Sequence, residues 1–120
     1  MAVDRASVSP ESAAARLVEM SVDVRIAVVA DPAGGLICAS DDLDSQRARA
    51  FAGLAADLFS AADGALGDPA QHVEAHVEGG GVFAVRSARH TLACVATRLA
   101  LPALILYDLQ STLTEMDASA

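Results

Sequence analysis

Residues 24–40 read VRIAVVADPAGGLICAS, with two apolar runs on either side of DPAGG. Asp31 followed by Pro32 suits the first two positions of a tight turn, and glycine adopts the positive φ that such turns need. The stretch therefore predicts a β-hairpin with a short loop. Because the run from Ile26 to Ala30 is apolar at nearly every position, its strand should be covered on both faces, inside a sheet flanked by helices.

The composition describes one acidic domain with an aliphatic core. The chain has 120 residues, of which 53% are hydrophobic but only 3% aromatic, so Ala, Val, Leu and Ile must fill the core. A formal net charge of −8 argues against a nucleic acid or an anionic membrane as partner. No apolar run is long enough for membrane insertion, and the first ten residues lack a signal-peptide core, so we expect a cytoplasmic protein.

Three helices are expected. Ser9-Pro10-Glu11 is typical of a helix start and predicts a short helix to about Met20. The longest helix should cover 45–66, and the last should run from Pro102 to about Met116. These limits predict a domain over 10–116, with flexible ends at 1–9 and 117–120.

The long helix has an unusually wide apolar surface. Its stripe at the helical period consists of Phe51, Ala55, Leu58 and Ala62. Ala50 and Ala61 widen the apolar arc on the side of Leu54, with Phe59 also at its flank. A helix of this kind should contact more than one surface.

Three further strands are expected after the long helix. Residues 71–78 alternate, with His72, Glu74, His76 and Glu78 on one face and Val73, Ala75 and Val77 on the other, as in a half-buried edge strand. Gly79-Gly80-Gly81 is expected to form a turn, followed by strands at 82–87 and 90–98. The element order predicts an α+β domain with a five-stranded antiparallel sheet and helices on both faces.

The motif His72-x-Glu74-x-His76 is a candidate zinc or nickel site, because two imidazoles and a carboxylate share one strand face. Same-face side chains lie ~6.6 Å apart along a strand, which is wide for one ion. The alternative is the polar face of an exposed strand, and it is favoured. We therefore assign no metal and no cofactor, and keep these three residues as weak candidates.

No catalytic set is recognisable. All eight basic residues are Arg, so no lysine serves a P-loop or a Schiff base, and no G-x-S-x-G motif surrounds a serine. Asp41, Asp42 and Asp44 lack the spacing of a calcium loop and suit helix capping. His90, at a strand start, is expected to be solvated. The chain is therefore not expected to be an enzyme.

The two cysteines, Cys38 and Cys94, lie in apolar strands and are expected to be buried, reduced thiols. An enzyme that uses one of these cysteines as a nucleophile is one alternative for the function of the chain. It would need an exposed thiol with a depressed pKa.

Three segments together resemble the Roadblock (dynein light-chain-like) family: AVVADPAGGL at 27–36, VEGGGVFAV at 77–85 and LILYDL at 104–109. The similarity covers about residues 10–116. The resemblance implies a profilin-like α+β fold, with the long helix on one sheet face and the terminal helices on the other. It also implies a bacterial, non-enzymatic regulator or scaffold for a Ras-like small GTPase.

The resemblance further implies a homodimer in which the third strand pairs with its copy and the long helices lie side by side. The expected interface consists of His72, Val73, Glu74, Ala75, His76, Val77, Ala50, Leu54 and Ala61. The alternative function is a dimer that senses a metal ion or a small ligand through the face formed by His72, Glu74 and His76.

Overall fold

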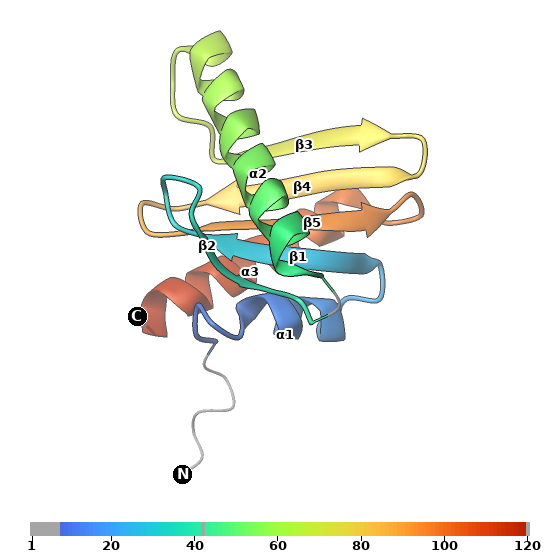
Figure 1. The fold of residues 1–120 in the computed structure, drawn as a ribbon. Coiled ribbons are helices and arrows are strands. Elements are labelled where there is room, and N and C mark those ends of the chain that lie inside the picture. Colours follow the sequence, from blue (N-terminus) through green and yellow to red (C-terminus); the bar gives the residue numbers. More distant parts are fainter. Residues whose placement is uncertain (1–7, 42, 120) are drawn as a thin grey trace.

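The computed structural model describes residues 8–41 and 43–119, which form the predicted five-stranded antiparallel sheet (Figure 1). The strands lie in the order β2-β1-β5-β4-β3, so β2 and β3 are the two edges. Every neighbouring pair is antiparallel, which confirms the α+β class. The strands are β1 (Val24–Ala30), β2 (Leu36–Ala39), β3 (His72–Val77), β4 (Gly80–Arg86) and β5 (Thr91–Thr97).

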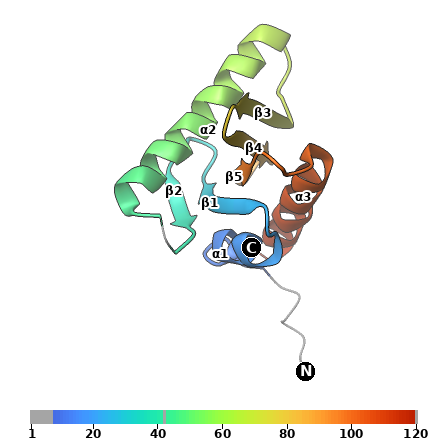
Figure 2. The ribbon, with the colours of Figure 1, turned by 90° about the vertical axis from the view of Figure 1, so that its right-hand side faces the viewer.

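Helices cover both faces of the sheet, as expected. Figure 2 shows α2 (Ser45–Leu66) on one face, and α1 (Ala13–Met20) and α3 (Pro102–Ser119) on the other. The buried side chains accordingly form two clusters, one on each side of the strands. No helix within the described residues is long and apolar enough to span a membrane.

The predicted hairpin has the expected limits, and Asp31 holds its loop. The Asp31 side chain accepts hydrogen bonds from the backbone N–H groups of Ala33 (2.9 Å) and Gly35 (2.8 Å). Gly34 has a φ of 94°, a conformation that glycine adopts without strain. The residues 27–30 are buried, so β1 is covered on both faces.

Helix α2 has the predicted limits, but its buried stripe differs from the predicted one. Asp44 caps its start by accepting from the Arg47 N–H at 2.9 Å, and Gly67 ends it in the left-handed conformation. The buried residues are Ala48, Phe51, Ala52, Ala55 and Phe59, whereas Leu58 and Ala62 are only half-buried. The helix crosses the sheet obliquely and projects past β3, so its last turns have no strand beneath them (Figures 1 and 2).

Both ends of the domain are more ordered than predicted. Helix α1 begins at Ala13 rather than at Pro10, because residues 9–12 form a turn in which the Ser9 carbonyl accepts from two backbone N–H groups. Val8 is only 1% exposed and belongs to the core. Helix α3 continues to Ser119, so residues 117–119 are helical and not a loose tail. The remainder of the predicted flexible ends, 1–7 and 120, lies outside the described residues.

The glycine run at 79–81 is only partly a turn. Glu78 and Gly79 connect the strands, while Gly80 and Gly81 belong to β4. A Cβ at Gly80 would overlap the backbone carbonyl oxygen of Ala96 on β5, and a Cβ at Gly81 would lie 2.9 Å from Phe83 Cε1. These two glycines therefore permit close packing within the sheet.

Candidate functional site

The free edge of β3 exposes backbone hydrogen-bonding groups at every second residue. The Arg86 N–H donates to the Gln71 carbonyl at 3.2 Å, which marks these two residues as a hydrogen-bonded pair. Because hydrogen-bonded and non-hydrogen-bonded pairs alternate in antiparallel sheets, Val73 and Ala75 bond to β4. The N–H and C=O groups of 72, 74 and 76 consequently point away from the sheet. This edge can accept another strand.

The side chains of β3 alternate as predicted. Val73 and Ala75 face α2 and are half-buried, and His72, Glu74 and His76 are exposed on the opposite face. Val77 departs from the pattern, since it is 73% exposed although it lies on the apolar face. Helix α2 crosses the other end of β3 and does not reach this position (Figure 1).

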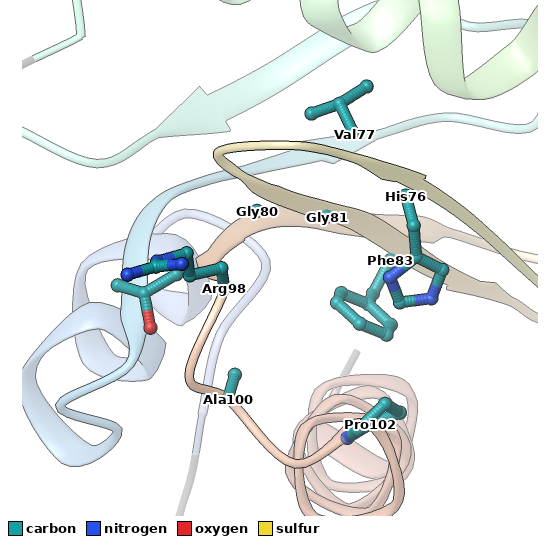
Figure 3. Close-up of a pocket in the computed structure, with 9 residues that line it drawn as sticks. His76, Val77, Gly80, Gly81, Phe83, Arg98, Ala100 and Pro102 are labelled. Atoms are coloured by element: carbon teal, nitrogen blue, oxygen red, sulfur yellow. The ribbon is translucent and has the colours of Figure 1, made fainter.

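The structure brings together two of the three candidate metal ligands. His76 Nε2 lies 2.7 Å from Glu74 Oε2, and its ring meets Phe83 edge-on with centroids 5.4 Å apart. Within residues 8–41 and 43–119, no three His, Cys, Asp or Glu side chains gather as a metal site. His76 also borders a cavity of about 260 Å³, with Arg98 on its other side (Figure 3).

The outer surface of α2 carries the remaining residues of the expected interface. Ala50, Leu54 and Ala61 are all exposed, and Leu54 retains 45% of its accessible surface. Leu66, in the last turn, is 68% exposed. Nothing in the sequence marks Leu66 as part of this surface, because only the position of β3 under the helix reveals that this turn projects beyond the sheet.

A clamp centred on Arg86 holds the C-terminal part of α2 next to the β3 edge. Its guanidinium donates to Asp63 Oδ1 (2.5 Å) and to the Ala70 carbonyl (2.8 Å), and it lies 4.4 Å above the Phe59 ring. The hydrogen bond from Arg86, with a second from the Ala70 N–H, holds the pKa of Asp63 below its usual range. The clamp therefore orients the overhanging turns of α2 relative to the free strand.

His90 is buried, so its expected solvation is wrong. It is 7% exposed, and its Nδ1 lies 2.6 Å from Asp117 Oδ1 in the last turns of α3. Arg89 Nη1 also donates to the Asp117 carbonyl at 3.1 Å. The imidazole thus joins the end of α3 to the turn between β4 and β5, which is a structural role.

Neither cysteine has the properties of a nucleophile, and both are free. Burial, with the charge of Asp108 nearby, raises the pKa of Cys94 to about 12. Burial likewise raises the pKa of the half-buried Cys38, whose thiol donates to the Pro10 carbonyl at 2.9 Å. A thiolate is disfavoured at both positions.

The aspartates before α2 do not form a calcium loop in the described residues. Asp44 caps the helix, as expected, and Asp41 is exposed, while Asp42 lies outside the described residues.

Comparison with solved structures gives the fold. A Roadblock/LC7 domain from Streptomyces avermitilis superposes with a TM-score of 0.81 at 20% identity, covering 93% of this chain and 98% of that one. Myxococcus xanthus MglB gives a TM-score of 0.76 at 13% identity, covering 91% of this chain and 92% of that one. Acanthamoeba castellanii profilin II gives 0.67 at 13% identity, covering 93% of this chain and all of that one (100%).

The chain therefore has the Roadblock/LC7 fold, a variant of the profilin-like α+β architecture, as the sequence resemblance implied. No model of a protein family matches the sequence, and a search of curated proteins finds no match.

Proposed function

We propose that this protein is a homodimeric, non-enzymatic regulator or scaffold that binds a Ras-like small GTPase in the bacterial cytoplasm. The observation that carries the proposal is the juxtaposition of an unpaired strand edge, β3, with an apolar helix that projects beyond it. An exposed edge of this kind is normally blocked or paired, because its free N–H and C=O groups attract another strand.

The length of α2 supports a second copy as the group that covers this edge. Its 22 residues make a helix ~33 Å long, whereas five strands span only ~19 Å between the outermost two. If β3 pairs with its copy about a two-fold axis, each overhang lies over the sheet of the other copy. The two α2 helices then lie side by side and bury Leu54, Ala50 and Ala61.

A small GTPase is proposed as the partner because of the sequence resemblance to the Roadblock family and because of the fold. The structure superposes on MglB from Myxococcus xanthus and on the gliding protein MglB from Thermus thermophilus, the latter with a TM-score of 0.74 at 16% identity. One similar structure is described as MglB with a tetrameric arrangement, which shows self-association for that protein. The surface of the present chain, with its excess of carboxylates, suits a folded protein partner better than a polyanion.

Two measurements test this proposal. The solution mass at two concentrations should correspond to a dimer, and a purified Ras-like GTPase encoded beside this protein should bind it. Nucleotide exchange and hydrolysis by that GTPase, measured with and without the protein, then distinguish a regulator from a scaffold. A monomer at both concentrations, or the failure of such GTPases to bind, would contradict the corresponding half of the proposal.

A dimer that senses a metal ion or a small ligand is the second candidate, favoured by the His76–Glu74 pair beside the 260 Å³ cavity. Titration calorimetry with zinc and nickel, on the wild-type protein and on His76→Ala, tests it. Heat of binding that disappears in the variant would support the sensor, and the absence of heat in the wild type would eliminate its metal form.

A further inference from the structure

Histidine and glutamate alternate along the exposed face of β3 and the turn that follows it. The exposed face carries His72, Glu74 and His76, and the turn that follows adds Glu78. From 72 to 78 the order on this face is His, Glu, His, Glu, and from 78 back to 72 it is Glu, His, Glu, His. Each histidine of one order therefore coincides with a glutamate of the other. Since an antiparallel copy meets β3 in the reverse direction, the strand is complementary to itself.

We propose that a second copy pairs with β3 in a single register, centred on Ala75, in which each histidine faces a glutamate. His76 then lies opposite Glu74 of the second copy, and His72 lies opposite its Glu78. This inference rests on the proposed dimer and adds its register and the side chains that select it. Directly opposite residues in antiparallel strands are close enough for their side chains to interact.

Backbone geometry restricts the choice of registers. Both α2 helices stay on the same face of a continuous sheet only if a residue with outward backbone groups meets another one, which allows centres at each residue from 72 to 76. Centres at His72 or His76 place a histidine against its own copy instead of against a glutamate. A centre at Glu74 places Glu74 against its own copy, and like charges directly opposite are destabilising. A centre at Val73 leaves His76 beyond the paired segment.

The exposed valine at the end of β3 favours the same register. Val77 is 73% exposed although it lies on the apolar face. Only the register centred on Ala75 sets Val77 opposite Val73 of the second copy, so that both valines pack beneath the α2 helices. Registers centred on Glu74 or Val73 place a polar or loop residue, Gln71 or Pro69, in that position.

The side chains at this edge are already arranged for such pairing. His76 is oriented by its edge-on contact with Phe83 and by its hydrogen bond with Glu74. A Cβ at position 81 would lie 3.2 Å from His76 Nδ1, so glycine leaves room for this ring. Arg98 lies on the far side of the adjoining cavity (Figure 3).

Cysteine crosslinking tests the register directly. In the proposed register Ala75 lies opposite its own copy in a non-hydrogen-bonded pair, with ~4.5 Å between Cα atoms, which suits a disulfide. Ala75→Cys should therefore form a crosslinked dimer with oxidised glutathione, and Glu74→Cys should not. Cys38→Ser is included in both variants to remove the more accessible native thiol, and Cys38→Ser alone is the control.

The outcomes separate this inference from the proposed function. Efficient crosslinking of Glu74→Cys but not of Ala75→Cys would overturn the register while leaving a dimer. A wild-type protein that is monomeric would instead overturn the dimer itself. Crosslinking of Ala75→Cys alone, in a dimeric protein, supports the inference.

Exchange of the two opposite side chains gives an independent test. His76→Glu places two carboxylates opposite each other at both symmetry-related sites and should raise the dimer dissociation constant about tenfold. Adding Glu74→His to it restores the opposite pairs and should return the constant towards the wild-type value. In a register centred on Glu74, His76→Glu would face His72 and would not weaken the dimer. Circular dichroism on each variant verifies that the monomer fold is retained.

Discussion

Substitution of Leu54 by alanine should weaken self-association without unfolding the protein. Leu54 lies on the outer face of α2 and is 45% exposed in the single chain. Complete burial of a leucine stabilises by ~1.5–3 kcal/mol, so burying the remaining exposed part contributes ~1 kcal/mol in each copy. Two copies contribute ~2 kcal/mol, and Leu54→Ala should raise the dimer dissociation constant about 30-fold.

Sedimentation equilibrium over a range of concentrations measures this change. Val22→Ala is a matched control, because Val22 is also a large exposed aliphatic residue, 92% exposed, but lies in the loop between α1 and β1. The control should leave the dissociation constant unchanged. If Leu54→Ala associates as tightly as the wild type, α2 does not pack against its copy and the side-by-side arrangement is wrong.

Three further predictions concern the single chain. The pKa of Asp63 is depressed, so its ionised form contributes stability above the unfolded-state pKa of ~3.9, and this contribution is lost as the pH falls through the folded-state pKa. In urea unfolding, Asp63→Asn should therefore lose less stability than the wild type on acidification below about pH 4. Equal losses in the two proteins would refute the role of the Arg86 clamp. Cys94, with a pKa of about 12, should resist Ellman's reagent at pH 8 until the protein unfolds, and rapid native-state labelling would contradict its burial. Gly80→Ala should destabilise the fold by about 2 kcal/mol or more in denaturant titration, because the new Cβ meets the Ala96 carbonyl, whereas Gly79→Ala, with open space at its Cβ, is the neutral control.

Local features of the fold could be predicted from the sequence where neighbouring residues determine them. The hairpin follows from Asp31, Pro32 and two glycines within one short stretch, and the limits of α2 follow from the Asp44 cap and the Gly67 stop. The alternation of β3 predicted an edge strand, and the sheet order confirms it.

Features that depend on distant residues could not be predicted in the same way. Buried His90 is partnered by Asp117, 27 positions later in the chain, and nothing near His90 in the sequence indicates this partner. The Arg86 clamp likewise joins residues 23 positions apart. The sequence predicts a turn at Gly80, because its close contact with β5 exists only when the strands are in register.

The most direct test of the central claim, that β3 pairs with a second copy, is the solution mass of Glu74→Pro. Proline removes the N–H at position 74, which points away from the sheet, and a strand edge facing solvent tolerates proline. Glu74→Ala controls for the loss of the carboxylate. Ala75→Pro provides the contrast, because the Ala75 N–H bonds to β4 and its loss should damage the fold itself.

We predict that light scattering finds a dimer for the wild type and for Glu74→Ala, and a folded monomer for Glu74→Pro. Circular dichroism should give the same spectrum for all three proteins. A Glu74→Pro protein that remains dimeric would contradict pairing through β3, and a wild-type protein that is monomeric would contradict the dimer.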